Sequence, residues 1–351
     1  MFPEFTLKNN FILITGGAGY IGSHMLRLLL EQGREAVVFD DLSTGRRERV
    51  PESVEFVRGD LRSAQDLEKL FSRFRFDAVL HFAASIVVPE SVSEPLKYYE
   101  NNVWGSVNLL RHCLKHGARK FIFSSSAAVY GQPELMPVNE EASLRPENPY
   151  GTSKMMVEQM LRDCAASGKM DYLALRYFNV SGAHPSGRIG QPLEEATHLL
   201  PNALKAAAGD IPELNIFGDD YPTRDGTCIR DYIHVMDLVR AHLLALDALD
   251  KGVKNAALNL GSGRGYSVKE MVSSVEKVTG SPIPVKIAAR RPGDAAELVA
   301  SYAKAEALLG WRPKLGLEQI ISSAWEWQQK NLGDAKRKKD EVIVKKRKSS
   351  G

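Results

Sequence analysis

The sequence has few cysteines and no long hydrophobic run, and both shortages narrow the classes of protein that it can encode. Its three cysteines, Cys113, Cys164 and Cys228, stand far apart and lack the paired spacing of zinc ligands. We therefore expect no disulfide scaffold and no metal site, and a reducing cytoplasm as the compartment. No stretch approaches the roughly 18 consecutive apolar residues of a membrane-spanning helix. The first eight residues lack a signal-peptide pattern, so no membrane partner is expected.

An excess of charge is also absent from most of the chain. Residues 335–351 carry eight Lys or Arg and two Asp or Glu. The other 334 residues carry 38 Lys or Arg and 41 Asp or Glu. Because the body is slightly acidic, no nucleic-acid partner is expected. The basic segment is expected to be a flexible, solvated tail, and an electrostatic contact with nucleic acid or membrane is the less favoured alternative.

Short apolar runs alternate with helical patterns through the first half of the chain. The predicted strands are 11–14, 36–39, 54–57, 78–82, 120–123 and 172–177, and the predicted helices are 20–31, 63–74, 95–116 and one from about residue 150. Strands that are apolar on both faces and alternate with helices predict an α/β fold with a doubly wound, Rossmann-like parallel sheet. Ligands of such sheets bind at the carboxyl ends of the strands.

The alternation stops after about residue 179, where Pro, Gly and charged residues become more frequent. We expect a nucleotide-binding domain over residues 10–178 that is rejoined by about 232–258. A smaller α/β substrate-binding portion is expected over 179–334, followed by the basic tail 335–351.

Three glycines follow the first predicted strand and open the first helix. Gly16, Gly19 and Gly22 have the spacing GxxGxxG, which allows a tight turn and a close approach of the backbone to a pyrophosphate at the helix N-terminus. Glycines in any strand–helix turn give this pattern by chance. Here the flanking strand, helix and second strand favour a dinucleotide site.

Acidic residues end the next two predicted strands. Asp40 stands 18 residues after Gly22, where a carboxylate binds ribose hydroxyls and repels a 2′-phosphate, so NAD is favoured over NADP. A role in a turn is the alternative, above all for the neighbouring Asp41. Asp60 is a further candidate on the adenine side.

A tyrosine and a lysine lie four residues apart at the start of a predicted helix. This spacing places Tyr150 and Lys154 on one helical face. A nearby ammonium and the positive nicotinamide are expected to lower the pKa of Tyr150 and favour its phenolate. Ser124 and Ser126 follow a strand at the same sheet edge, and the hydroxyl of Ser126 could bind the same substrate oxygen. Capping of a turn is the alternative for these serines, especially Ser124.

Taken with their neighbours, these motifs resemble a known superfamily. GGAGYIGSH (16–24), SSSAAVYG (124–131) and YGTSK (150–154) resemble the extended short-chain dehydrogenase/reductases. RYFN (176–179), GAHP (182–185), FGDDYPT (217–223), GTCIRDYIHV (226–235) and RRPGD (290–294) resemble the UDP-glucose 4-epimerase family. The similarity spans about residues 11–330. It implies a UDP-sugar substrate, an NAD that stays bound, and a homodimer with contacts over 95–116 and 150–167.

The resemblance also implies a mechanism. Tyr150, as phenolate, takes the proton of the sugar 4-hydroxyl while C4 passes a hydride to NAD⁺. Ser126 relays at the same oxygen, and Lys154 holds the nicotinamide ribose. The 4-keto sugar then turns and receives the hydride on its other face.

Further contacts follow from the resemblance, residue by residue. The cofactor set comprises Gly16, Gly19, Tyr20, Ile21, Gly22, Asp40, Asp41, Leu42, Asp60, Leu61, Phe82, Ala83, Ala84, Asn102, Ser124, Tyr150, Lys154 and Phe178. The substrate set comprises Ser126, Tyr150, Asn179, His198, Leu199, Phe217, Arg230, Arg291, Asp294 and Leu298. The two arginines suit the diphosphate because guanidinium binds phosphate bidentately. Phe217 is expected beside uracil, with a buried core position as the alternative.

Three positions depart from the family pattern. Ile86 stands where some of these epimerases carry a lysine towards the cofactor phosphates, so NAD is expected to be held differently or less tightly. His198 stands where others have Asn. Leu298 aligns with a position where enzymes restricted to UDP-glucose and UDP-galactose carry Tyr. Because leucine lacks the phenol ring, a sugar with an N-acetyl group at C2 stays an open alternative substrate.

Two rival functions remain at this point. Related dehydratases and decarboxylases carry acidic residues where this chain has Ala127 and Ala128, so a general catalyst for dehydration is missing. An NAD-sensing protein without turnover would not need Tyr150, Lys154 and Ser126 together. Other UDP-sugars, such as N-acetylhexosamines or pentoses, are the alternative substrates.

Overall fold

A seven-stranded sheet forms the centre of the molecule. The computed structural model describes residues 8–191, 198–291 and 293–330. The sheet consists of β1 (Lys8–Thr15), β2 (Ala36–Asp40), β3 (Glu55–Arg58), β4 (Phe74–His81), β5 (Lys120–Ser126), β6 (Asp171–Tyr177) and β10 (Ala256–Leu260). Its order is β10-β6-β5-β4-β1-β2-β3, with every pair parallel. The predicted doubly wound α/β class is therefore confirmed. The chain order reverses between β1 and β4, where such sheets bind ligands.

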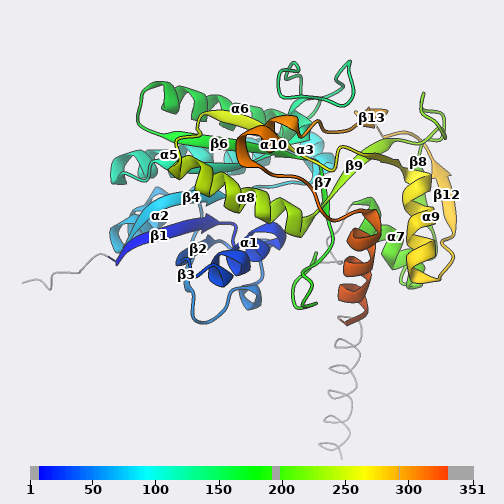
Figure 1. Cartoon of the computed structure of the whole chain (residues 1–351), viewed down its shortest axis with the longest axis horizontal. Helices are drawn as coiled ribbons and strands as arrows, with labels where there is room; N and C mark the ends of the chain where they lie inside the picture. Colours follow the sequence, from blue (N-terminus) through cyan, green and yellow to red (C-terminus); the bar gives the residue numbers. More distant parts are fainter. Residues whose placement is uncertain (1–7, 192–197, 292, 331–351) are drawn as a thin grey trace, which may run out of the picture.

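Helices cover both faces of this sheet (Figure 1). Helices α1 (Tyr20–Glu31) and α8 (Val235–Asp250) share one apolar cluster, which includes Ile12 and Ile14 of β1. Helices α2 (Ala64–Arg73), α5 (Gly105–His116) and α6 (Pro149–Ala166) share another cluster, which includes Leu13. Alternate residues of one strand thus point into opposite layers, which explains why the strands are apolar throughout.

The start of α6 is specified by its sequence. Asn148 is the N-cap, and its side-chain oxygen accepts a hydrogen bond from the amide of Gly151 at 2.9 Å. Pro149 occupies the first helical position, where its missing N–H costs nothing. Tyr150 consequently lies in the first turn of α6, at the carboxyl edge of the sheet.

Two predicted elements differ in extent from the structure. The helix predicted over 95–116 is divided into α4 (Pro95–Tyr98), a π-helical segment (Tyr99–Trp104) and α5. Strand β4 begins at Phe74, inside the predicted helix 63–74. Buried Phe74 and Phe76 alternate there with exposed neighbours, so the period is that of a strand.

The remaining residues build a smaller part beside the large sheet. Strands β7 (Asn179–Ser181), β9 (Ile229–His234), β11 (Gly265–Ser267) and β13 (Glu297–Leu298) form a second sheet, and β8 (Leu214–Phe217) pairs with β12 (Val285–Ala288). Helices α7 (Leu199–Ala207), α9 (Val268–Thr279) and the helical residues 317–330 share a third apolar cluster. The predicted domain boundaries stay predictions, and the tail 335–351 lies outside the described residues.

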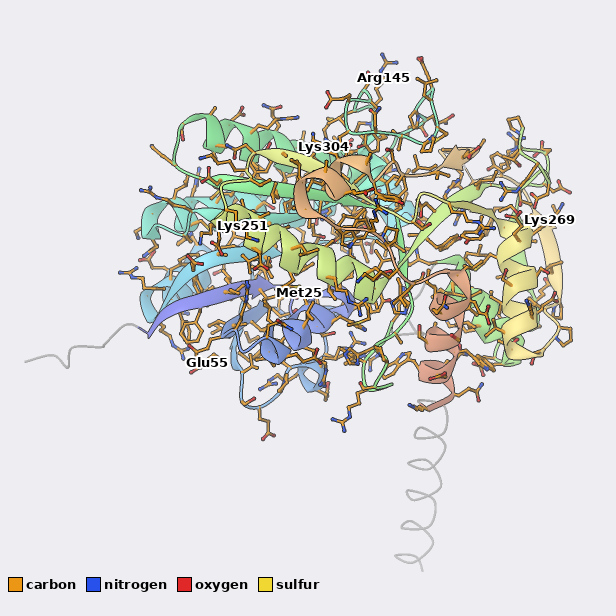
Figure 2. The ribbon with its side chains drawn as sticks, viewed as in Figure 1. Met25, Glu55, Arg145, Lys251, Lys269 and Lys304 are labelled. Carbon is orange, nitrogen blue, oxygen red and sulfur yellow. The ribbon has the colours of Figure 1, made fainter. Side chains whose placement is uncertain are left out.

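The side chains follow the expected division between core and surface. Met25 of α1 is fully buried, whereas Arg145, Lys251 and Lys269 are exposed (Figure 2). Within residues 8–191, 198–291 and 293–330, no helix has both the length and the apolar character needed to cross a membrane.

Candidate functional site

The glycine loop after β1 is packed too tightly for side chains. Gly16 has a φ of +71°, and a Cβ there would lie 2.6 Å from the amide nitrogen of Ala83. A Cβ on Gly22 would lie 2.3 Å from the carbonyl oxygen of Gly16. Helix α1 follows Gly19 with no acidic residue in its first turn, so its free amides and dipole favour an anion. The loop therefore fits a dinucleotide phosphate.

Asp40 lies beside this loop at the end of β2. Its carboxylate accepts hydrogen bonds from the amides of Ala18 and Leu42, both at 2.9 Å. Burial raises the pKa of Asp40, and these two hydrogen bonds act in the opposite direction. Leu42 adopts a φ of +62°, which the bond to Asp40 helps to hold. Asp40 thus stabilises the loop in addition to its predicted contact with ribose.

The other acidic candidates have local partners. One oxygen of Asp41 accepts from the amide of Ser43 at 2.8 Å and from its hydroxyl at 2.7 Å, which is the turn role left open above. Asp60 pairs with Arg62, whose hydrogen bonds lower the pKa of the carboxyl. Leu61 is buried. Contacts of these three residues with the cofactor stay predictions.

Other predicted cofactor residues surround the loop. The hydroxyl of Tyr20 donates to the carbonyl of Gly182 at 2.6 Å and so ties α1 to the segment after β7. Ile21 packs against the cluster that α1 and α8 share. Phe82 donates its amide to Thr15 at 3.0 Å, and Ala84 follows in the same loop, partly buried.

Asn102 lies in the π-helical segment, with its side chain fully engaged. Its oxygen accepts from the amide of Ser85 at 2.8 Å. Its nitrogen donates to the carbonyl of Ser85 at 3.0 Å and to the hydroxyl of Ser153 at 2.9 Å. Asn102 therefore joins the loop after β4 to α6, and its predicted contact with the cofactor is untested.

The predicted catalytic residues lie together at the end of β5 and the start of α6. The phenol of Tyr150 is hydrogen-bonded to the side chain of Ser126. The ammonium of Lys154 is buried and donates to the carbonyl of Ser124 at 2.9 Å. It lies 5.8 Å from the centre of the Tyr150 ring. The hydroxyl of Ser124 also contacts that of Tyr177.

Burial sets the ionisation of this group. It lowers the pKa of Lys154 to about 7. It raises the pKa of Tyr150, against the lowering effect of the hydrogen bond to Ser126. In the protein by itself the pKa of Tyr150 is therefore raised, and the lowering expected from Lys154 together with the bound nicotinamide stays a prediction. The physical reason is that a phenolate buried at this position would lose its hydration, and the Lys154 ammonium is directed towards the Ser124 carbonyl.

A buried ion pair that the sequence analysis missed holds α6 on the sheet. Arg176 of β6 donates to Glu158 through Nη2 at 2.6 Å and Nε at 2.9 Å, and the hydroxyl of Ser125 donates to Glu158 at 2.6 Å. Glu158 lies one helical turn beyond Lys154. The available signal was an arginine within the apolar run 172–177.

A second cluster gathers the residues predicted for the nucleotide. Asp294 pairs with Arg291 at 2.9 Å and with Arg230 at 3.6 Å. The Arg291 guanidinium lies 4.7 Å from the centre of the Phe217 ring, whose residue is 38% exposed, so the core alternative for Phe217 is wrong. His198 retains exposed surface; desolvation of its ring and, second, the charge of Arg291 lower its pKa.

Leu298 lies between the two clusters. It is paired in register with Arg230 on the neighbouring strand. It packs against the apolar group that includes Phe178 and Ala127, the residue after Ser126. The predicted sugar-facing position therefore lies beside residues of both the predicted catalytic cluster and the predicted nucleotide cluster.

Asn179 and Leu199 occupy the flanks of the second cluster. The side chain of Asn179 is hydrogen-bonded to Tyr232. Burial raises the pKa of Tyr232, and the charges of Arg230 and Arg291 act in the opposite direction. Leu199 begins α7 and packs, partly buried, against the third apolar cluster. Tyr232 was not predicted, because nothing in its local sequence separates it from a core residue.

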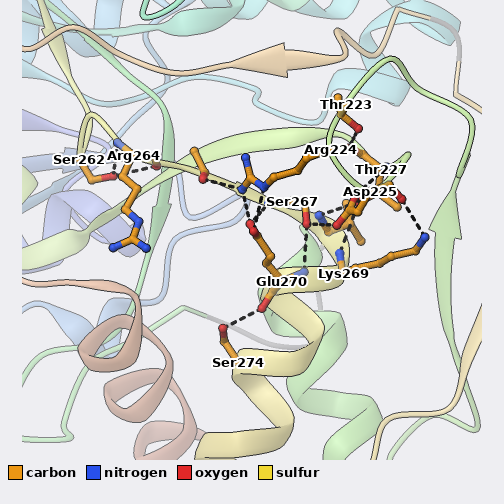
Figure 3. A network of polar contacts seen from close by, with 12 residues as sticks. Thr223, Arg224, Asp225, Thr227, Ser262, Arg264, Ser267, Lys269, Glu270 and Ser274 are labelled. Atoms are coloured by element: carbon orange, nitrogen blue, oxygen red, sulfur yellow. Dashed lines mark hydrogen bonds and ion pairs between the residues drawn. The ribbon is translucent and has the colours of Figure 1, made fainter.

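The loop between Phe217 and Arg230 is fixed to α9 by a polar network (Figure 3). Asp225 accepts from the amide and hydroxyl of Thr227 at 2.9 and 2.7 Å and from the hydroxyl of Ser267. Ser267 and Glu270 form a capping box at the start of α9. This network orders the segment between Phe217, the predicted uracil contact, and Arg230, a predicted diphosphate contact.

Comparisons with known proteins agree along most of the chain. Residues 12–261 match the model of the NAD dependent epimerase/dehydratase family. A UDP-glucose 4-epimerase of Azospirillum brasilense is 53% identical over 318 residues, which cover 90% of this chain and 91% of the relative. The resemblance stated from the sequence is thereby confirmed.

Solved structures are similar as well. A UDP-glucose 4-epimerase from Stenotrophomonas maltophila, with bound NAD and formylated UDP-arabinopyranose, has a TM-score of 0.89 and 42% identity, covering 93% of this chain and 99% of that one. The UDP-Glc/GlcNAc 4-epimerase from Campylobacter jejuni has a TM-score of 0.80 and 46% identity, covering 92% and 99%.

The buried lysine predicts a particular dependence of stability on pH. Lys154 titrates near pH 7 when folded and near 10.5 when unfolded, so between these values the unfolded chain binds the additional proton. The free energy of unfolding therefore rises as pH increases from about 7 to about 9.5. Lys154→Met should reduce this rise by on the order of 1 kcal/mol or more. Urea titrations measure it.

Lys251→Met, at an exposed position, serves as the control and should keep the wild-type pH dependence. An equal rise in the wild type and in Lys154→Met would contradict the burial of a titrating ammonium at this site.

Proposed function

The chain belongs to the UDP-glucose 4-epimerases of the NAD-dependent epimerase/dehydratase family, and we propose that the residues described above perform their reaction. The enzyme interconverts UDP-galactose and UDP-glucose and depends on NAD. The observation that carries the assignment of roles is the contact between Tyr150 and Ser126 at the sheet edge that also carries the glycine loop. When bound, NAD supplies the acceptor and donor of hydride and a positive charge.

Tyr150 is the residue that moves the proton. Its phenolic oxygen takes the proton of the sugar 4-hydroxyl and later returns it, while Ser126 hydrogen-bonds at the same place. Because burial disfavours the phenolate, a positive charge beside the ring is needed to make Tyr150 an effective base. Lys154, whose ammonium is held by the Ser124 carbonyl, is proposed to bind the cofactor ribose.

Arg230 and Arg291 are proposed to hold the diphosphate. In the protein they share the carboxylate of Asp294, so two positive charges face one negative charge. A diphosphate would restore the balance through charge-assisted hydrogen bonds. Phe217 would cover the uracil, so the nucleotide stays fixed while the sugar turns.

The rival functions have less support. The turn after Ser126 consists of Ala127, Ala128 and Val129, which supply no acid for a dehydration step. A protein that only senses NAD would gain nothing from the contact between Tyr150 and Ser126. Both rivals are therefore set aside.

The first prediction from the proposed function concerns Tyr150. Tyr150→Phe keeps the ring and removes the proton carrier, so kcat for UDP-galactose should fall by about 10²- to 10⁴-fold with a nearly unchanged KM. Initial rates of UDP-glucose formation measure this. Tyr172→Phe, buried elsewhere in β6, is the matched control and should retain wild-type kcat. A Tyr150→Phe enzyme as fast as the control would overturn the assignment.

We also propose that the enzyme accepts UDP-N-acetylhexosamines. Leu298 is partly buried beside small residues, Ala127 and Ala300. By the family resemblance, it lacks the tyrosine ring expected at this position in enzymes restricted to UDP-glucose and UDP-galactose. The Campylobacter jejuni enzyme, described as acting on both kinds of substrate, supports this proposal.

The second prediction tests the role of Leu298. Leu298→Tyr should lower the rate with UDP-N-acetylgalactosamine by at least about tenfold and the rate with UDP-galactose by less than about threefold. Leu298→Met conserves volume and should retain both rates. Parallel rate measurements decide between the outcomes. If Leu298→Tyr slows both substrates equally, the residue does not select the sugar substituent.

We further propose a homodimer built on the face of α6. Large apolar side chains are exposed there: Val92 of α3 (Val88–Ser93), Leu96 of α4, Trp104 and, on α6, Met156, with 65%, 71%, 45% and 42% exposure. Helices α3 and α4 and the π-helical segment pack along α6, so these residues can form one patch. A second copy would cover it.

The third prediction tests this face. Met156→Glu should convert a particle with the mass of two chains into one with the mass of a single chain, because a charge would be buried in the interface. Light scattering after size exclusion measures the mass. Val285→Glu, on exposed β12, should leave the dimer intact. A wild-type particle with the mass of one chain would rule out the dimer.

Two remaining proposals concern the chain as a whole. The nucleotide-binding domain is proposed to comprise residues 10–178 with 232–258, because α8 and β10 rejoin the large sheet. A cytoplasmic location is proposed because Cys113, Cys164 and Cys228 are free thiols.

A further inference from the structure

A chain of buried hydrogen bonds begins beside the glycine loop. Thr15 is the last residue of β1, directly before Gly16. Its hydroxyl contacts Nδ1 of His81, the last residue of β4, at 2.7 Å. Nε2 of His81 contacts the hydroxyl of Ser106 on α5 at 2.9 Å. The imidazole therefore joins two strands and a helix below the predicted cofactor site.

The chain continues to the catalytic tyrosine. The hydroxyl of Ser106 donates to the carbonyl of Asn102 at 2.5 Å. The Asn102 side chain donates to the hydroxyl of Ser153 at 2.9 Å, and Ser153 donates to the carbonyl of Tyr150 at 2.7 Å. The first turn of α6 is thereby tied to the π-helical segment that contains Asn102. Segments of this kind often occur at functional sites.

The directions of these bonds determine the state of His81. Ser106 uses its hydrogen for the Asn102 carbonyl, so it accepts from His81, which must carry its proton on Nε2. Nδ1 then accepts from the hydroxyl of Thr15. Burial and, second, the charge of Lys154 lower the pKa of His81 to about 3, so the ring stays neutral.

Burial makes each of these bonds costly to lose. The exposed fractions of Thr15, His81, Asn102, Ser106 and Ser153 are between 0 and 3%. A donor or acceptor left unpaired at such a position cannot form a hydrogen bond with water, so its neighbours must shift to provide a new partner. A change at His81 therefore displaces the residues that follow it in this series of hydrogen bonds.

We propose that His81 is a positioning residue that fixes the backbone of Tyr150 relative to the glycine loop, through Ser106, Asn102 and Ser153. His81 touches no reacting atom in this account. It acts by holding the phenol at the distance from Ser126 that proton transfer requires, since a displacement of about 1 Å can cost about 10²-fold in rate. The inference rests on the proposed epimerase function.

The test compares three variants of the holoenzyme as purified. His81→Leu removes both imidazole bonds, and His81→Gln retains a donor towards Ser106. His112→Leu is the matched control. Like His81, His112 is buried, but it lies on α5 and its Nδ1 is paired with the Asn108 carbonyl. The readouts are kcat, KM, the pH profile of kcat with UDP-galactose, and the NAD retained per chain.

The expected result is a fall in kcat of about tenfold or more in His81→Leu, with KM for UDP-galactose changed less than about twofold. Loss of the hydrogen bond from Ser126 would raise the pKa of Tyr150, so the acid limb of the profile should move to higher pH. His81→Gln should recover part of kcat. His112→Leu should match the wild type, and only the His81 variants should retain less NAD.

Ser153→Ala is a second probe with less effect on folding. Because both residues belong to the same series of hydrogen bonds, their effects are coupled. The combined reduction in kcat of the double variant His81→Leu, Ser153→Ala should therefore be smaller than the product of the two single reductions. Equal kcat, pH profile and NAD content in His81→Leu and His112→Leu would overturn the inference. If the wild type converts no UDP-galactose, the proposed function fails. The retained NAD then decides the inference by itself.

Discussion

The ion pair between Glu158 and Arg176 is the constraint on which the site depends most. It joins α6 to β6, and Ser125 extends it to β5, with all three side chains buried. Removing one partner of such a pair typically costs about 3–5 kcal/mol, because the other charge is left without compensation. Since Lys154 and Tyr150 lie one and two turns before Glu158, the pair orients the helical face that carries them. The contacts of Tyr150 with Ser126 and of Lys154 with Ser124 follow from that orientation.

The electrostatics of the two clusters differ in a way that suits their tasks. The predicted catalytic residues are buried, and burial opposes both the phenolate of Tyr150 and the ammonium of Lys154. Their ionisation therefore responds strongly to any charge that enters. The nucleotide residues remain partly exposed, and Arg230 and Arg291 already share the charge of Asp294. Such a surface can bind a diphosphate without burying an unpaired arginine.

The sequence predicted the features that depend on contiguous residues. The glycine spacing, the acid at the end of β2 and the Tyr–Lys pair each lie within one turn, one strand or one helix, so periodicity and motif locate them in the fold. The sequence missed what depends on contacts between distant segments. His81 binds Thr15 and Ser106, and Glu158 binds Arg176, across 66, 25 and 18 residues. Nor did it indicate how completely the Tyr150 phenol is buried, and this burial raises the pKa of Tyr150 in the protein by itself.

The central claim is that this chain carries out a complete cycle of oxidation and reduction at C4 with a cofactor it keeps. The most direct test incubates the purified protein with UDP-galactose, without added NAD, and follows the anomeric protons by NMR. The account predicts that UDP-glucose appears until equilibrium is reached, with no net reduction of cofactor. Persistence of UDP-galactose alone, even after NAD is supplied, would contradict it.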